Sequence, residues 1–252
     1  MSTGGMYGDR AEYYDAIYHW KDYRTESERL CTLLRAEGVA DGAEILEAAC
    51  GTGSHLVHLR QHYAVTGFDI SEPMIAIARS KLPGVPLYVA DMTDTSAVRP
   101  ASADALLCLF SAIGYVHPEE RLQRAAQTFA RALRPGGVLI VEPWLTERVY
   151  REGRVTLQTY EREDLKLARA SVSHRAGELS VFDMHWLVAK QDAADVESFV
   201  EHHELWMCPT ETMLSVFRAA GFEARFEADG LMKDRGLVIG RRTLRDPMRP
   251  PP

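Results

Sequence analysis

Hydrophobic and polar residues alternate in a regular order along the middle of the chain. Short apolar runs predict buried strands at 44–49, 64–70, 85–91, 103–112 and 138–144. Amphipathic segments between them predict helices at 55–63, 71–82 and 118–133, the second with Ser71 as its N-cap and Pro73 in its first turn. Residues 134–137 (RPGG) are expected to form a turn. Strands that alternate with helices indicate a parallel sheet covered on both faces.

The pattern changes to a two-residue alternation between residues 153 and 206. Segments at 154–161, 165–174, 178–188 and 197–207 follow it. The third segment places its apolar residues on one face: Phe182, Met184, Trp186 and Val188. The alternation predicts an antiparallel sheet with one buried face, inserted after the fifth strand of the α/β series.

The flanking segments complete one α/β domain around this insertion. Residues 11–37 predict two helical stretches that end before Gly38, and 210–222 predict a helix that ends at Gly221. Two last strands are expected at 223–228 and 236–242. The predicted organisation is a Rossmann-like domain (1–150 and 207–243) with an N-terminal helical lid, an antiparallel insertion (151–206) and a disordered tail (244–252).

Composition limits the classes of function. The net charge of the 252 residues is −7, so the broad basic surface that nucleic acid requires is not expected. No apolar run approaches the ~18 residues of a membrane span, and the first residues lack the apolar segment of a signal peptide. The four cysteines have no CxxC or metal-ligand spacing, which predicts reduced thiols, a cytoplasmic protein and no metal site.

A glycine-rich loop follows the first predicted strand. The sequence from Glu47 to Gly53 reads EAACGTG and leads into a helix, where backbone N–H groups favour an anionic or polar ligand. A dinucleotide site requires GxGxxG, and the third glycine is missing here. Asp69 ends the second strand, where an acid can accept both ribose hydroxyls. A glycine-rich turn without a ligand is the simpler alternative.

The loop resembles the first motif of class I S-adenosylmethionine methyltransferases, hydrophobic-acidic-x-Gly-x-Gly-x-Gly, with Ala49 in place of the first glycine. Asp91 and Met92 end the third strand, where this superfamily meets the adenine, and LRPGGVLIVEPW resembles its fifth-strand block. The resemblance implies a mostly parallel Rossmann-like sheet whose last strand is antiparallel, with S-adenosylmethionine as cofactor.

Longer blocks narrow the resemblance. DRAEYYDAIYHWKDY, LEAACGTGSHL, FSAIGYV, EPW, SVSHRAGE and RGLVIG are similar to bacterial N,N-dimethyltransferases of nucleotide-linked amino-deoxysugars, which serve antibiotic biosynthesis. The similarity runs from about residue 7 to 241. Two departures lie in the acceptor half: one tryptophan, Trp144, follows EP where relatives carry two, and LMKD (231–234) replaces Gly-Pro-Ser-Gly.

The resemblance implies roles for individual residues. Cofactor contacts are expected from Tyr14, Tyr23, Glu47, Ala49, Gly51, Gly53, Asp69, Asp91, Met92 and Leu109. Contacts with the nucleotide-sugar acceptor are expected from Tyr7, Glu142, Pro143, Trp144, Ser173, His174, Arg175 and Arg235. The candidates for orienting or deprotonating the acceptor are Tyr7, Tyr115 and His117. Each also has a plainer interpretation, the tyrosines as packing aromatics and the others as surface or strand residues.

The expected chemistry is an in-line displacement on an activated methyl group. An amine attacks only as the free base, and its proton can leave to water, so neither an indispensable general base nor a metal is expected. The insertion is expected to form a wall of the acceptor pocket or a homodimer surface. Other open functions are a small-molecule O- or N-methyltransferase with another acceptor, and a cofactor-binding protein without activity.

Overall fold

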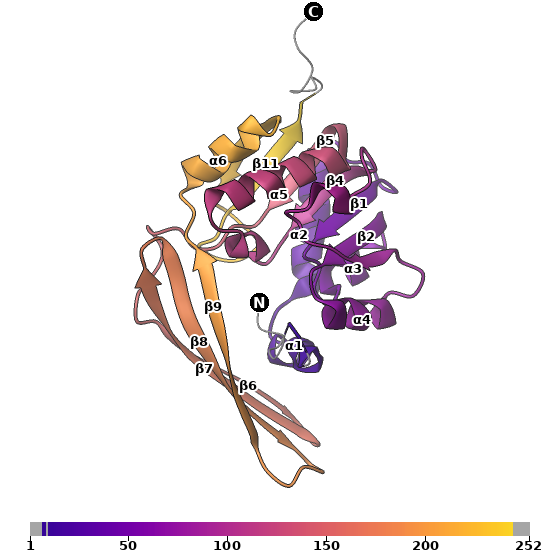
Figure 1. Cartoon of the computed structure of the whole chain (residues 1–252). Coiled ribbons are helices and arrows are strands. Elements are labelled where there is room, and N and C mark those ends of the chain that lie inside the picture. The colour runs from indigo at the N-terminus through magenta and orange to yellow at the C-terminus, as the bar shows by residue number, and fades with distance from the viewer. Residues whose placement is uncertain (1–6, 9, 244–252) are drawn as a thin grey trace, which may run out of the picture.

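A seven-stranded sheet forms the centre of the α/β domain (Figure 1). The structure is a computed structural model and describes residues 7–8 and 10–243. The strands of the sheet are β1 (Glu44–Ala48), β2 (Ala64–Asp69), β3 (Leu87–Val89), β4 (Ala103–Cys108), β5 (Leu133–Val141), β10 (Phe222–Glu227) and β11 (Leu237–Arg242). They lie in the order β10-β11-β5-β4-β1-β2-β3. β11 is antiparallel to β5 and β10, and the remaining neighbours are parallel.

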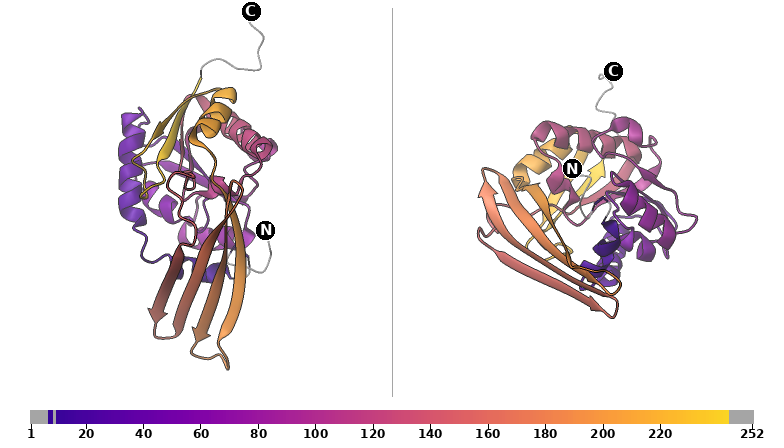
Figure 2. Two further views of the ribbon diagram at one scale, coloured as in Figure 1. Left: turned by 90° about the vertical axis from the view of Figure 1, so that its left-hand side faces the viewer. Right: turned by 60° about the horizontal axis from the view of Figure 1, so that its bottom comes forward.

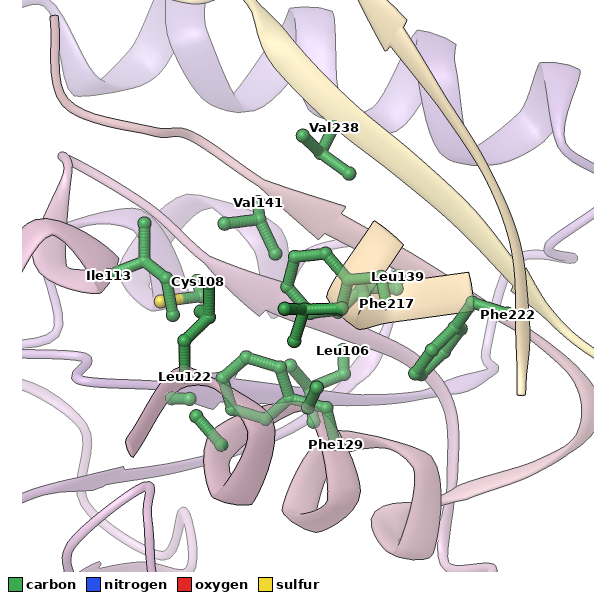
Figure 3. Close-up of a cluster of buried hydrophobic side chains, with 14 of the residues drawn as sticks. Leu106, Cys108, Ile113, Leu122, Phe129, Leu139, Val141, Phe217, Phe222 and Val238 are labelled. Atoms are coloured by element: carbon green, nitrogen blue, oxygen red, sulfur yellow. The ribbon is translucent and has the colours of Figure 1, made fainter. Parts of the chain in front are cut away.

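Helices cover both faces of this sheet. They are α2 (Tyr23–Ala36), α3 (Ser54–Leu59), α4 (Glu72–Lys81), α5 (Glu119–Ala132) and α6 (Thr210–Ala219). On one face, Phe129 of α5 and Phe217 of α6 stack at 6.5 Å and pack with Leu139 of β5 (Figure 3). The cluster on the other face draws on α2, α3 and α4. Burial of each such side chain contributes roughly 1.5–3 kcal/mol.

Local sequence signals account for several boundaries. The Ser71 Oγ accepts the Met74 N–H at 3.2 Å, and Pro73 lies in the first turn of α4, as predicted. The prediction of a turn at 134–137 was wrong, because β5 begins at Leu133 and runs through these residues. Gly136 has a φ of 81°, and the pairing with β4 shifts between Ala103 and Ala105, so RPGG forms an irregularity inside the strand.

The second sheet contains the four strands of the insertion. They are β6 (Val155–Arg162), β7 (Leu165–Ala176), β8 (Leu179–Lys190) and β9 (Glu197–Trp206), paired antiparallel in sequence order. One face is buried, with Trp186 only 1% exposed. Figure 2 shows this sheet extending from the α/β domain as a separate layer.

Two short N-terminal helices, η1 (Ala11–Tyr13) and α1 (Tyr14–Ile17), lie between α4 and the inserted sheet. Tyr14 and Ile17 share a buried cluster with Met74 of α4 and Trp186 of β8. This architecture confirms the expected fold, a mostly parallel sheet with an antiparallel last strand and an inserted antiparallel sheet. None of the described helices has the length and apolar character needed to cross a membrane. The predicted disordered tail, 244–252, lies outside the described residues.

Candidate active site

The glycine-rich loop joins β1 to α3 at the carboxyl edge of the parallel sheet. Ala49, Gly51 and Gly53 all have positive φ, at 53°, 54° and 75°. The Gly51 N–H donates to Asp69 Oδ2 at 2.9 Å, which ties the loop to the end of β2. A Cβ on Gly53 would lie 2.7 Å from Leu82 Cδ1, so this glycine allows close packing and lies outside the cavity lining.

A cavity lies above the ends of β1, β2 and β4 and holds most of the predicted cofactor residues. Its lining includes Tyr14, Ala49, Gly51, Asp69, Asp91, Met92 and Leu109. Asp69 also accepts the Ser71 N–H, at 2.9 Å on Oδ1. Burial raises the pKa of the Asp69 carboxyl, and hydrogen bonds from backbone N–H groups oppose that rise. The N–H groups of Ser71, Gly51 and Ile70 account for part of the roughly four lone-pair sites of a carboxylate, so Asp69 keeps acceptor capacity for a ligand hydroxyl.

A smaller cavity continues from the first on the α2 and α3 side. Tyr14, Tyr23, Glu47 and His55 are among its lining residues. Burial raises the pKa of Glu47, whose Oε1 lies 3.4 Å from His55 Nδ1. His55 Nε2 lies 2.9 Å from Glu26 Oε2. Burial works against a charge on His55, but the hydrogen bonds to Glu26 and Glu47 outweigh it and raise the pKa to about 9.

Sequence reasoning missed this buried charge cluster. Lys21, 6% exposed, pairs with Glu26 and lies 4.4 Å from the centre of the Phe110 ring. Lys21 and Glu26 stand five residues apart at the start of α2, in a pattern that also describes a solvated helix end. No signal in the sequence distinguishes a buried ion pair from a solvated helix end here, because the other members of the cluster, His55 and Glu47, come from other elements.

A third cavity lies between the α/β domain and the inserted sheet. Predicted residues in its lining are Tyr7, Tyr115, Trp144, Ser173 and Arg235. Four residues of its lining carry a buried polar atom that has no hydrogen-bond partner among the described residues: Trp144 Nε1, Tyr150 Oη, Ser180 Oγ and Arg235 Nη1. The charged lining residues are mostly cations, Arg151, Arg154, Arg169, Lys233 and Arg235 with Asp234. The cavity therefore presents donors and positive charge in a chain of net charge −7.

Tyr7, Phe110 and Tyr115 line both the large cofactor cavity and the third cavity. The hydroxyls of Tyr7 and Tyr115 are 3.5 Å apart. Burial raises the pKa of Tyr7 and of Tyr115 well above the ordinary value for tyrosine, so both stay neutral hydroxyls at physiological pH. The Tyr115 hydroxyl lies 2.9 Å from Nδ1 of His203, a residue that sequence reasoning did not select.

The segment after β4 is shaped by a buried carboxylate. The predicted strand 103–112 ends at Cys108, and Phe110 and Ser111 have φ values of 51° and 61°. Glu142 Oε2 accepts the Phe110 N–H at 2.7 Å, and Ser111 Oγ donates to the carbonyl of Pro143. Glu142 and Pro143 are thus buried beneath the cavity lining.

Besides Gly53, Glu142 and Pro143, three more predicted site residues lie outside these cavities, which corrects their expected placement. His117 is exposed, and its ring packs 5.3 Å from that of Trp206. His174 and Arg175 are exposed near the end of β7. The Arg175 guanidinium donates to Glu147 and to the Gly177 carbonyl. Alternation along a strand sends neighbouring side chains to opposite faces, so Ser173 reaches the cavity and His174 does not.

Comparison with known proteins agrees with this geometry. A family described as "Methyltransferase domain" matches residues 45–137. A dTDP-3-amino-3,4,6-trideoxy-α-D-glucopyranose N,N-dimethyltransferase of Streptomyces venezuelae is 33% identical, over 92% of this chain and 97% of its own. A dTDP-3-amino-3,6-dideoxy-α-D-glucopyranose N,N-dimethyltransferase of Streptomyces fradiae is 36% identical, over 92% of this chain and 91% of its own.

Solved structures extend the likeness to three dimensions. Streptomyces venezuelae DesVI superposes with a TM-score of 0.85 at 32% identity, covering 93% of this chain and 99% of that one. CalS10 with bound S-adenosylmethionine, an amino pentose methyltransferase from Micromonospora echinaspora, superposes with a TM-score of 0.80 at 31% identity. The superposition covers 93% of this chain and 96% of that one.

The fold, the loop and the carboxylate at the end of β2 define an S-adenosylmethionine-dependent methyltransferase of class I. Within that class, the chain belongs to the family of dTDP-amino-sugar N,N-dimethyltransferases. The residues present fit the cofactor, since Ala49 and Gly51 of the loop and the Asp69 carboxylate line one cavity at the ends of β1 and β2.

Proposed function

We propose that this enzyme N,N-dimethylates the amino group of a dTDP-linked amino-deoxysugar. The observation that carries the proposal is the third cavity, hereafter the acceptor cavity. It shares Tyr7, Phe110 and Tyr115 with the cofactor cavity, and its lining residues include cations and buried donors that have no partner within the part of the chain that the structure describes. A pyrophosphate supplies the acceptors that such buried donors lack, and a guanidinium binds it at two points.

The cofactor contacts follow from the lining of the two cofactor cavities. Asp69 would accept the ribose hydroxyls, and Asp91 with the Met92 N–H would meet the adenine. Tyr14, Tyr23 and Glu47 would lie around the methionine end, in the smaller cavity. When bound, S-adenosylmethionine supplies a methyl group that is already activated toward a nucleophile.

The residues of this chain would orient the amine and exclude water. Tyr7 and Tyr115 stand where the cavities meet, and their raised pKa values make them neutral hydrogen-bonding groups instead of phenolate bases. The amine proton would leave to water before the attack. Arg235 and Trp144 would hold the phosphates, so that the amino group is presented near Tyr115.

The test is mass spectrometry of products from a panel of acceptors. dTDP-3-amino- and dTDP-4-amino-deoxysugars would be offered beside the same amino sugars without the nucleotide. We expect dimethylation of one or more dTDP-linked sugars and no turnover of the free sugars. Methylation of phosphate-free amines or hydroxyls alone would refute the proposal and favour a different natural-product acceptor. A lack of turnover with every amine and hydroxyl acceptor would favour a cofactor-binding protein without activity.

We also propose that a second copy of the chain covers the outer face of the inserted sheet. Val155, Leu157, Leu187 and Val200 are 73%, 68%, 53% and 53% exposed, and all lie on the face opposite Trp186. When the same surface patch of two copies packs together, the interface has two-fold symmetry. Light scattering should give a dimer that Leu157→Lys dissociates, and a monomeric wild type would refute this.

The free, buried cysteines agree with action in the reducing cytoplasm.

A further inference from the structure

His203 lies directly behind Tyr115, at the junction of the cofactor and acceptor cavities. It belongs to β9 and is 5% exposed, whereas Tyr115 belongs to η3 (Ala112–Tyr115) and lines both cavities. The distance from His203 Nδ1 to the Tyr115 hydroxyl is 2.9 Å. The inserted sheet thus contributes a polar contact to a residue at the reaction centre, although His203 itself is not part of the cavity lining.

Aromatic packing fixes the His203 ring. It stacks on Phe182 at 5.3 Å with an interplanar angle of 22°, and Phe182 stacks on Trp144 at 6.2 Å. Tyr7 meets the imidazole edge-on at 6.0 Å. Among the described residues, Nε2 has no hydrogen-bond partner. The orientation of the ring therefore depends on packing, and its polar contact is directed at Tyr115.

Burial and the charges around His203 keep the ring neutral. Burial, followed by the charges of Arg169 and His202, lowers the pKa of His203 to about 4, and Asp183 opposes this. A neutral imidazole has one nitrogen that accepts and one that donates. A group with so low a pKa is unsuited to removing a proton from an alkylammonium, so its contact with Tyr115 calls for a role other than general base.

We propose that His203 is a positioning residue whose Nδ1 accepts the Tyr115 O–H, so that the tyrosine oxygen offers its lone pairs to the acceptor amine. The inference rests on the proposed function, because it assumes an amine at Tyr115. The amine N–H then donates to the tyrosine oxygen, and the nitrogen lone pair stays free for the methyl group. Without His203, the Tyr115 O–H can donate to that lone pair and compete with methyl transfer.

The decisive variant is His203→Phe, which keeps a ring on Phe182 and removes Nδ1. With dTDP-3-amino-3,6-dideoxy-α-D-glucopyranose as the probe, kcat should fall roughly tenfold, as for one lost hydrogen bond. The affinity for S-adenosylmethionine and the melting temperature should not fall. His203→Asn, which restores an acceptor near the Nδ1 position, should recover most of kcat. His202→Phe is the matched control, since His202 is exposed and bonded to Asp183, and it should leave kcat unchanged.

A double-variant cycle separates this role from a merely structural one. Because His203 acts through Tyr115, His203→Phe should add no further loss of kcat to Tyr115→Phe. Wild-type kcat in His203→Phe, or multiplied losses in the double variant, would overturn the proposal.

A substrate-independent measurement distinguishes failure of this inference from failure of the proposed function. Nitrogen-15 NMR of ring-labelled wild-type protein should show His203 with Nδ1 unprotonated and Nε2 protonated. A proton on Nδ1 would overturn the inference even if every amino sugar is methylated. Because this measurement uses the wild-type protein, it tests the inference even if His203→Phe does not fold.

Discussion

Replacement of Arg235 by lysine tests how the acceptor is held. The Arg235 Cζ lies 4.9 Å from the centre of the Trp144 ring and 5.5 Å from that of Phe110, and its Nη1 is buried with no hydrogen-bond partner in the described ranges, 7–8 and 10–243. Lysine is preferred to a neutral residue because it keeps a positive charge near the buried Glu142, where burial raises the pKa and the charges of Arg235 and Lys21 oppose that rise. What lysine loses is the planar guanidinium and its second donor.

The expected effect is on acceptor binding. Loss of one charge-assisted hydrogen bond costs about 1.5–3 kcal/mol. That free energy corresponds to an increase of about 10- to 150-fold in the acceptor KM. The dissociation constant of S-adenosylmethionine should not change, because Arg235 lines neither cofactor cavity. If the contact is equally strong in ground and transition states, kcat also stays the same.

Initial-rate kinetics with a dTDP-amino sugar, and calorimetry with S-adenosylmethionine, measure the two effects separately. Arg225→Lys is the matched control, because this exposed arginine of β10 pairs with Glu37 and Glu227 away from the cavity. A wild-type acceptor KM in Arg235→Lys would refute a role of the guanidinium in acceptor binding. An equal loss of affinity for S-adenosylmethionine and for the acceptor would also refute it.

Four further outcomes are expected. Asp69→Ala should weaken S-adenosylmethionine binding by about 1–3 kcal/mol in calorimetry, since it removes a charged acceptor and releases the Gly51 N–H; unchanged affinity would contradict the assignment. His117 is exposed and lies outside the cavities, so His117→Ala should keep kcat within about twofold of wild type. Addition of a chelator should have as little effect, whereas loss of a general base costs at least ~100-fold in kcat. Ala49→Gly, at a φ of 53°, should raise the free energy of unfolding by about 0.5–1 kcal/mol in denaturant titrations, because relief of left-handed strain exceeds the entropy that glycine adds to the unfolded chain. The pKa of His55 is raised from 6.5 to about 9, so its stabilising contribution is complete below pH 6.5 and is lost as the pH rises to about 9. His55→Gln should remove this part of the pH dependence, and an unchanged slope would show that other groups cause it.

The sequence by itself determined the layers of the fold and the type of cofactor. Strand and helix periods, caps and glycine turns are short-range properties, so Ser71, Gly221 and the alternation in β8 could be interpreted without any neighbour from elsewhere in the chain. The loop from Glu47 to Gly53 and the acids at strand ends are also local, because parallel strands place their carboxyl ends at one edge.

Only the tertiary structure decided which side chains meet. His203 and Tyr115 are 88 residues apart, and their contact depends on how the inserted sheet docks on the segment after β4. The prediction that this strand extends to residue 112 was wrong because Glu142, from a neighbouring strand end, binds the Phe110 N–H and turns the chain. That turn brings Tyr115 to the cavities, whereas His117, two residues on, faces solvent. Side-chain direction depends on backbone angles and on partners from distant segments, neither of which the hydrophobic pattern contains.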